Sequence, residues 1–379
     1  MNEVWITDLA VTTGLGPTLA ATWQGLMAGR TAIRPVTRFT TDHYSSRLAA
    51  CVADLEPERP GGSRLWPLLE RTAAQLAPPP PGARLLTATT KGAIDVLERG
   101  RRGWPADPDA WSLPRLLTRI SRHLGLATDG GANINAACAS STIALAQGAA
   151  AIAAGRAEAV VVCCMDLVSE FAFSGFSALR ALAPTPCQPF DRDHAGLSLG
   201  EGAAIIVMVS AELARREKRP CRGTILGWGV ANDATHITAP ARDGCGLIQA
   251  LQQALRRAAV TPDTIAGIGA HGTGTVHNDQ MELTAFRAVF GAAIPPVLAS
   301  KGALGHTLGA AGGIELALGL QALAMQQAPP TVGLRHPMEG AAALACSEAV
   351  ALRGECLLRC NSGFGGINAA LVLGRGRDG

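Results

Sequence analysis

NINAACASSTIALAQGAAAIAAG, residues 133–155, is the stretch that most narrows the choice of fold. A short apolar segment leads to Cys138, and a long run of alanine and other small residues follows it. The run is about as long as a membrane span, but it holds little leucine and is followed by Arg156 and Glu158. A buried helix is the better interpretation, and it places Cys138 at a strand-to-helix junction.

Cys138 allows two interpretations at this junction. Cysteine is often a small buried packing residue. A thiol at the start of a helix can instead be a nucleophile, because the positive end of the helix dipole lowers its pKa. The hydroxyls of Ser140, Ser141 and Thr142 are expected to cap the helix. The local sequence leaves both interpretations open.

Apolar strands and helices alternate along the rest of the chain, which predicts an α/β fold with sheets covered on both faces. The expected strands lie at 4–13, 157–167, 200–210 and 224–230, then at 266–275, which ends in a glycine loop, and within 348–374. The expected helices lie at 18–33, 243–265 and 312–327.

Composition excludes several classes of protein. The 379 residues carry a net charge of +3 and 4% aromatic residues, which does not indicate a nucleic-acid surface. The ten cysteines have irregular spacing and form no CxxC pair, as expected in a reducing compartment. Glu3 and Asp8 interrupt the apolar start of the chain, so we expect no signal peptide and a cytoplasmic location.

Two of the eight histidines lie in glycine-rich turns that follow apolar runs, His271 in GAHGTGT and His306 in SKGALGHTLGAAGG. Glycine lets backbone close on a ligand at such turns. A zinc site from His271, His277 and Asp279 is a weaker interpretation, because its spacing fits no closed site. The GIGAHG match at 267–272 is not followed by the helix that a dinucleotide site requires.

The glycine turn NSGFGGIN, residues 361–368, is either an ordinary hairpin or a source of backbone N–H groups for an oxyanion. With Cys138 and the two histidine turns, it completes an ordered series of motifs. The series resembles the β-ketoacyl-acyl-carrier-protein synthases of the condensing-enzyme, or thiolase, superfamily. The matching segments are ITDLAVTTGLGPTLAATWQGLMAGRTAI (6–33), NINAACASS (133–141), CQPFDRDHAGLSLGEGAA (187–204), NDATHITAP (232–240), AHGTGTVHNDQMEL (270–283), SKGALGHTLGAAGGIE (300–315) and CNSGFGGIN (360–368).

The resemblance implies a duplicated, five-layered αβαβα thiolase-like fold that forms dimers. Residues 1–240 would form the half that carries the nucleophile, and residues 241–379 the half that carries both histidines and the glycine turn. The active site would lie between the halves. The implied reaction is a decarboxylative condensation in fatty-acid or polyene/polyketide biosynthesis, with an acyl carrier protein as partner and with no cofactor or metal.

The resemblance also implies roles for individual residues. Cys138 would take the acyl chain as a thioester, and His271 and His306 would bind the malonyl thioester carbonyl. Lys301 would pair with Glu282 and hold the surroundings of the histidines. The backbone N–H groups of Cys138 and Phe364 would form the oxyanion hole, and Phe364 would also gate the acyl pocket. Supporting positions around the site are Thr273, Thr275, Asp279, Gly363 and Gly365.

The chain departs from the family pattern at several positions. Ser362 replaces a usual phenylalanine, Gly302 replaces a usual serine after Lys301, and Leu197 stands where phenylalanine is frequent. The segment 96–130 is shorter than usual. These features resemble synthases of specialised pathways, such as polyene or type II polyketide systems. A carrier protein is expected to dock on a basic rim formed by Arg115, Arg119 and Arg122.

Two alternatives stay open. The chain could be a subunit of an obligate heterodimer, either the active half or a non-catalytic chain-length-factor-type partner, although such partners usually lack the cysteine. It could also be a degradative thiolase, which needs a second catalytic cysteine. Cys356 and Cys360 are candidates, although they precede the glycine turn on an expected strand. Relatives that start chains would have asparagine at the position of His306.

Overall fold

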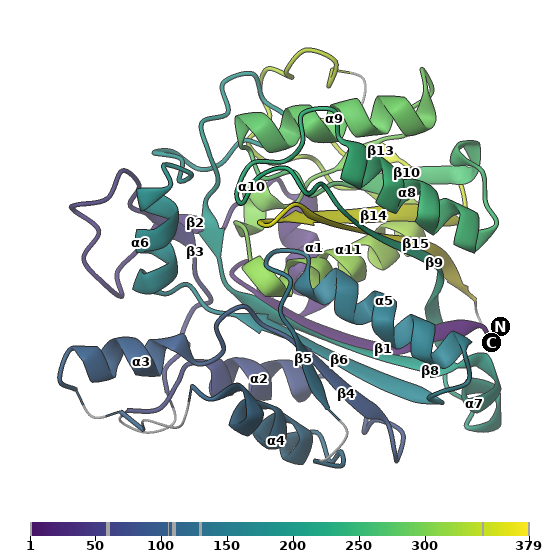
Figure 1. Cartoon of the computed structure of the whole chain (residues 1–379), viewed down its shortest axis with the longest axis horizontal. Coiled ribbons are helices and arrows are strands. Elements are labelled where there is room, and N and C mark those ends of the chain that lie inside the picture. The colour runs from purple at the N-terminus through teal and green to yellow at the C-terminus, as the bar shows by residue number, and fades with distance from the viewer. Residues whose placement is uncertain are drawn as a thin grey trace.

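A computed structural model describes residues 2–57, 61–104, 106–107, 111–128, 131–342 and 345–377. Ten of its strands form one mixed sheet made of two sets that join at β1 and β9 (Figure 1). In sheet order the first set is β5 (Ala132–Ile134), β4 (Arg84–Ala88), β6 (Ala159–Asp166), β8 (Gly202–Ser210) and β1 (Val4–Thr13). The second set is β9 (Cys221–Asn232), β15 (Ile367–Arg377), β14 (Cys356–Gly363), β10 (Ile265–Gly269) and β11 (Val297–Leu298).

The two sets have the same topology. Numbered along the chain within each set, the strands lie in the order 1-5-4-2-3. In both sets the second strand is parallel to the third and fourth, and the fifth is antiparallel to its two neighbours. This repeated arrangement is the internal duplication that the sequence analysis predicts.

The helices form three layers around these strands. Helices α5 (Ser140–Ala153) and α11 (Ala311–Met325) contact each other and strands of both sets, so they make the central layer (Figure 1). Helices α2 (Leu65–Ala73) and α4 (Leu113–His123) cover the first set. Helices α8 (Cys245–Ala258) and α9 (Val276–Phe290) lie on the outer side of the second set. The result is the expected αβαβα order.

The remaining elements connect the layers. They are the helices α1 (Leu19–Met27), α3 (Ile94–Arg101), α6 (Glu170–Ala178), α7 (Ala211–Arg216) and α10 (Lys301–Leu304), with 3-10 turns at Pro262–Thr264 and Leu308–Ala310. One small sheet holds β2 (Ile33–Pro35), β3 (Leu48–Ala50) and β7 (Leu199–Gly200), and another holds β12 (Gln327–Ala328) and β13 (Val350–Ala351).

Most expected elements are confirmed, with shifts at their ends. Every residue of β6 and β8 is buried, as their continuous apolar runs predict. The helix expected over 18–33 ends at Met27, because Gly29 has a φ of 64° and the chain then enters β2. The helix expected over 243–265 ends at Ala258, and Ile265 already begins β10.

One described helical stretch, Leu308–Met325, is apolar and long enough to cross a membrane. It is 83% buried, and it overlaps α11 in the central layer, where a core helix must be apolar all round. The predicted division of the chain at residue 240 stays a prediction, since β9 pairs with strands of both sets.

Candidate active site

Cys138 lies in the turn between β5 and α5. Ala137 before it has a φ of 49°, a left-handed conformation that is uncommon for a residue with a side chain. Ser140 Oγ stabilises the turn, because it accepts from Ala136 N at 2.9 Å and donates to Ala137 O at 2.5 Å. The side chain of Cys138 is thereby fixed at the amino end of the central helix.

The expected capping of α5 by Ser140, Ser141 and Thr142 is wrong, because no side chain caps this helix. The three hydroxyls contact other groups instead. Ser141 Oγ accepts from Gly313 N at 3.0 Å, which ties α5 to α11. Thr142 Oγ1 donates to Asn361 Oδ1 at 2.5 Å, which ties α5 to β14.

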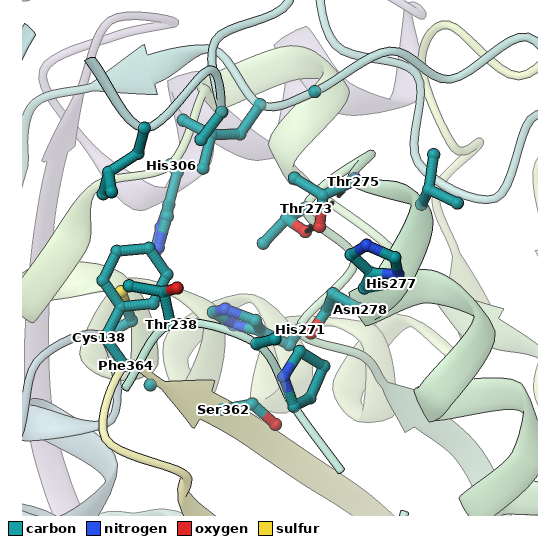
Figure 2. A pocket seen from close by; sticks show the side chains of 18 of the residues that line it. Cys138, Thr238, His271, Thr273, Thr275, His277, Asn278, His306, Ser362 and Phe364 are labelled. Carbon is teal, nitrogen blue, oxygen red and sulfur yellow. Dashed lines mark hydrogen bonds between the residues drawn. The ribbon is translucent and has the colours of Figure 1, made fainter. Parts of the chain in front are cut away.

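The two glycine turns bring His271 and His306 to Cys138, so that the thiol sulfur and a ring nitrogen of each histidine lie within 4.8 Å of one another. Figure 2 shows the three side chains converging from different segments. The histidine rings lie 5.1 Å apart and nearly perpendicular, at 85°. All three side chains are buried. The predicted constellation is therefore assembled in three dimensions.

Hydrogen bonds fix which nitrogen of His271 carries the proton. Its Nδ1 faces two donors, Asn361 Nδ2 at 3.2 Å and Lys301 Nζ at 3.4 Å. Nδ1 must therefore accept, and the proton belongs on Nε2. His306 follows the same pattern, because its Nδ1 accepts from Leu308 N at 3.4 Å and its Nε2 has no partner among the described residues.

Both histidines are neutral. Burial, followed by the charge of Lys301, holds the pKa of His271 and of His306 well below the usual value. Each ring can thus direct one neutral N–H group toward a negative charge. The same tautomers present a proton rather than a lone pair at Nε2, which does not fit a metal held by Cys138, His271 and His306.

The predicted ion pair between Lys301 and Glu282 is wrong. Lys301 Nζ lies 2.5 Å from Glu315 Oε1 and also donates to His271 O at 2.5 Å. Glu282 instead accepts from the backbone N–H groups of His271 at 2.6 Å and Gly272 at 2.7 Å. The reason is that α11 carries Glu315 to Lys301, whereas α9 carries Glu282 to the backbone of the His271 turn.

Burial shifts the pKa of both groups in the expected pair. The pKa of Lys301 falls to about 7, mainly because burial disfavours its charged form. The pKa of Glu282 rises for the same reason. Near neutral pH, Lys301 is therefore close to its own pKa.

Burial also governs the Cys138 thiol. It raises the pKa of Cys138 to about 11, against the opposing effects of Lys301, Lys91 and the backbone N–H of Phe364. The lowered pKa expected from the helix dipole is thus wrong. Gly363 lies against the same turn, since a Cβ there would lie 3.0 Å from Ala136 O and 3.2 Å from Cys138 N.

Several residues of the network were not predicted as members of the site. Glu315, Arg359 and Asn361 are buried beside Lys301 and His271, and Glu315 accepts from both Arg359 and Asn361. A signal was present for Glu315, the one charged residue of the mostly apolar helix α11. Arg359 is likewise a charge within a buried strand. Burying charges of this kind requires partners, which is what places them beside the site.

Two cavities meet at Cys138. One, of about 410 Å³, is lined by His271, His306 and Ser362, with Thr273 and Thr275 across from Cys138 (Figure 2). The other, of about 740 Å³, runs toward α3 and α6. Besides Cys138, three side chains line both cavities: Phe176, Leu179 and Phe364. The Phe176 and Phe364 rings lie 5.7 Å apart, where a gate between the cavities would stand.

The other predicted positions have mainly local contacts. Asp279 accepts from Phe190 N at 2.8 Å and Gly274 N at 3.2 Å, so it shapes the loops beside the site and does not converge with His271 and His277 on a metal position. Thr273 and Thr275 share a 2.9 Å hydrogen bond between their hydroxyls. Gly365 has a φ of 87° in the turn after β14.

The candidate second cysteines do not reach the site. Cys356 and Cys360 lie on β14, and the buried Cys360 thiol contacts Gly269 O at 3.7 Å. Of the described residues that line the two cavities, Cys138 is the single cysteine. The arginines of the expected basic rim lie on α4, and carrier-protein docking there stays a prediction.

Comparisons with known proteins agree with this geometry. Residues 116–214 match the family model "Beta-ketoacyl synthase, N-terminal domain", and residues 222–335 match "Beta-ketoacyl synthase, C-terminal domain". A 3-oxoacyl-[acyl-carrier-protein] synthase 2 of Coxiella burnetii is 29% identical, covering 99% of both chains. The tetracenomycin polyketide synthase ketoacyl synthase alpha subunit of Streptomyces glaucescens is 30% identical, over 100% of this chain and 98% of that protein.

Solved structures show the same likeness. The ishigamide ketosynthase/chain length factor has a TM-score of 0.90 at 30% identity, covering 99% of both chains. A ketosynthase in complex with its chain length factor from Xenorhabdus doucetiae has a TM-score of 0.84 at 25% identity, covering 99% of this chain and 98% of that chain. With the duplicated fold and the convergence of Cys138, His271 and His306, these matches show that the chain belongs to the β-ketoacyl synthase family.

Proposed function

We propose that this protein is a β-ketoacyl-acyl-carrier-protein synthase that condenses a malonyl group with an acyl chain held on Cys138. The observation that carries the proposal is the meeting of the Cys138 thiol with the His271 and His306 rings, within 4.8 Å, where two cavities join. One cavity can admit the malonyl donor while the other holds the acyl chain. No cofactor or metal takes part in the proposed reaction.

The first half-reaction is acyl transfer. The Cys138 sulfur attacks the carbonyl of an acyl thioester, the new S–C bond forms, and the donor's C–S bond breaks. The proton of the Cys138 thiol ends on the departing thiol. The backbone N–H of Phe364 faces the sulfur, and with the N–H of Cys138 it would stabilise the oxyanion. Because burial raises the pKa of Cys138 to about 11, the resting group is the thiol.

The second half-reaction is decarboxylation and condensation. The malonyl C–C bond breaks, CO2 leaves, and the electron pair forms an enolate. The Nε2–H groups of His271 and His306 would stabilise the enolate oxygen. The enolate carbon then attacks the acyl thioester, a C–C bond forms, and Cys138 leaves as a thiolate that takes up a proton. Lys301 and Asn361 support this step because they hold His271 in the required tautomer.

The partners follow from this chemistry and from the relatives. Both substrates would arrive on an acyl carrier protein, and the enzyme would act in the cytoplasm as a dimer. Two similar structures are described as ketosynthases together with a chain length factor, which favours a heterodimer with a synthase-like subunit over a homodimer. In that assembly this chain would be the active half, because it holds Cys138 and both histidines. Residues 1–240 and 241–379 would form its two halves.

Intact-mass spectrometry after incubation with acyl-carrier thioesters tests the proposal. We expect an acyl adduct on the native protein that Cys138→Ala abolishes. Cys245→Ala is the matched control, because Cys245 lies outside both cavities and should leave the adduct unchanged. An adduct that persists in Cys138→Ala would overturn the assignment of the nucleophile.

The histidines are tested separately from the nucleophile. We expect His271→Ala or His306→Ala to stop CO2 release from malonyl-carrier protein while Cys138 still acylates. The physical reason is that the histidines contact the donor carbonyl and not the acyl chain. Loss of acylation in both variants would mean that the histidines serve the thiol instead.

A further inference from the structure

Charged residues of both signs line the cavity toward α3 and α6: Lys91, Glu98, Arg101, Arg102 and Glu170. Glu98 accepts from Phe171 N at 2.6 Å and Glu170 pairs with Arg102, so both carboxylates have partners of their own.

Lys91 follows β4 and lines this cavity together with Cys138 and Asn135. Its side chain is 11% exposed. The ammonium donates to Thr90 Oγ1 at 2.8 Å and to Asp166 Oδ1 at 3.2 Å. A lysine in this position is a fixed polar feature of the space that would hold the acyl chain.

Asp166 anchors Lys91 through an ion pair and also has several other hydrogen-bond donors. Asp166 is fully buried at the end of β6 and accepts from Thr89 Oγ1 at 3.0 Å, Thr90 N at 3.1 Å and Gly309 N at 2.7 Å. These donors satisfy the carboxylate without the ammonium. Lys91 supplies the positive charge beside this buried carboxylate, and the other donors leave part of the ammonium's hydrogen-bonding capacity free.

The ammonium also has unused capacity. It carries three N–H groups, and the described part of the chain provides acceptors for two of them. A plain hydrocarbon chain that filled the cavity would cover the third group and remove its water. An oxygen atom on the chain would accept from it instead, and a charged donor makes a stronger hydrogen bond than a neutral one.

We propose that this cavity selects acyl chains that carry an oxygen acceptor, such as a keto or hydroxyl group, and that Lys91 is the residue that recognises it. The inference rests on the proposed function, because it concerns the chain bound to Cys138. It names the substrate class as oxygenated acyl thioesters, in preference to saturated hydrocarbon chains of the same length. Asn135, whose Nδ2 donates to Thr90 O at 3.2 Å, lines the cavity beside Lys91.

The test compares two pantetheine thioesters of equal length, octanoyl and 3-oxo-octanoyl, by the rate of adduct formation on Cys138. We expect the native protein to prefer the 3-oxo substrate by about tenfold or more, since a site built to hydrogen-bond a polar group discriminates against its absence. Lys91→Met keeps the length of the side chain without its charge and should remove the preference. Arg101→Met is the matched control, because it removes an exposed cation from the rim of the same cavity.

The outcomes separate the two proposals. Failure of both thioesters, and of a wider panel, to acylate Cys138 would overturn the proposed function itself. Acylation without preference, or with a preference that Lys91→Met leaves unchanged, would overturn the role of Lys91 and leave the proposed function standing. If Arg101→Met removes the preference as fully as Lys91→Met does, the preference comes from the overall positive charge of the cavity. That result would overturn the proposed contact between Lys91 and the acyl-chain oxygen.

Discussion

At the scale of single residues, Arg359 helps to position the side chains around His271, a role that the sequence analysis did not predict. It is among the largest fully buried side chains and lies on β14, next to β10, the strand that leads to His271. Its guanidinium donates to Ala270 O and to Glu315. Glu315 in turn contacts Lys301 and Asn361, the two donors at His271 Nδ1. The Glu315 carboxylate is thus shared by Lys301 and Arg359.

The strand next to Arg359 leaves room for it only because residue 269 is glycine. A Cβ at Gly269 would lie 2.7 Å from Arg359 Cδ. Burial lowers the pKa of Arg359 to about 10, so the guanidinium stays charged at neutral pH. Arg359 is therefore a permanent cation that competes with Lys301 for Glu315. We infer that it acts on the reaction through His271, as a positioning residue.

Replacing Arg359 should separate the two half-reactions. We expect Arg359→Met to slow CO2 release from malonyl thioester by roughly tenfold or more, because Glu315 would shift toward Lys301 and loosen the donors at His271 Nδ1. Acylation of Cys138 should stay within about threefold of the native rate, since it does not use this network. Single-turnover mass spectrometry and CO2 release measure the two rates.

Two further variants distinguish a positioning role of Arg359 from a purely structural one. Arg359→Lys retains the charge and should recover part of the CO2 release. Arg375→Met removes a more exposed arginine from the neighbouring strand β15 and should change neither rate. If CO2 release and acylation fall together in Arg359→Met, with a matching fall in melting temperature, Arg359 is only structural.

At the scale of elements, the sequence predicted whether a segment is a helix or a strand better than it predicted which side chains contact each other. The apolar runs predicted β6 and β8 because burial on both faces leaves a local record in the sequence. The partner of Lys301 left no such record, because Glu315 reaches it from a separate helix. Likewise, Ser141 and Thr142 were expected to cap their own helix but bond to α11 and β14. A local sequence pattern does not show which of several distant groups a buried polar side chain will bond to.

The crossing of α5 and α11 is a close packing contact between two helices. A Cβ at Gly312 would lie 2.1 Å from Thr142 Oγ1 and 2.8 Å from Thr142 N. No side chain fits at that distance without a shift of one helix. The crossing also fixes Cys138, at the start of α5, relative to His306, which precedes α11 along the chain.

Gly312→Ala should therefore destabilise the protein by about 2 kcal/mol or more, and slow acylation of Cys138 as the helices move apart. Gly175→Ala is the control, because Gly175 lies in helix α6 with no atom within 4 Å of the added Cβ. That change should be neutral or stabilising by up to about 1 kcal/mol. Urea unfolding measures both, and equal effects in the two variants would contradict the account of the crossing.

At the scale of the whole molecule, the duplication explains where the site lies. Both sets of strands place the loop after their third strand, β5 or β11, at the start of a central helix, α5 or α11. The segment after β5 carries Cys138, and the segment after β11, which includes α10, carries Lys301 and His306. The second strand of the later set, β10, adds His271. Because the central helices pack against both sets, the reacting groups meet in the interior, where burial sets their pKa values.

This burial links folding to pH. The folded pKa of His271 and of His306 is well below the unfolded value of 6.5. Below pH 6.5 the unfolded chain therefore binds protons that the folded protein does not, and stability falls as the pH falls. Each histidine should contribute a slope approaching about 1.4 kcal/mol per pH unit until its folded pKa is reached.

His306→Gln, which cannot be protonated in this range, should remove one histidine's share of that slope. The measurement is the free energy of unfolding in urea between pH 7 and pH 5. The comparison uses the slope of this free energy against pH, not its absolute value. His123→Gln is the control, because His123 is exposed at the end of α4 and meets solvent in both states. If the slope of His306→Gln equals that of the native protein, His306 is not held neutral by the fold, and its role as a neutral N–H donor to the enolate fails with it.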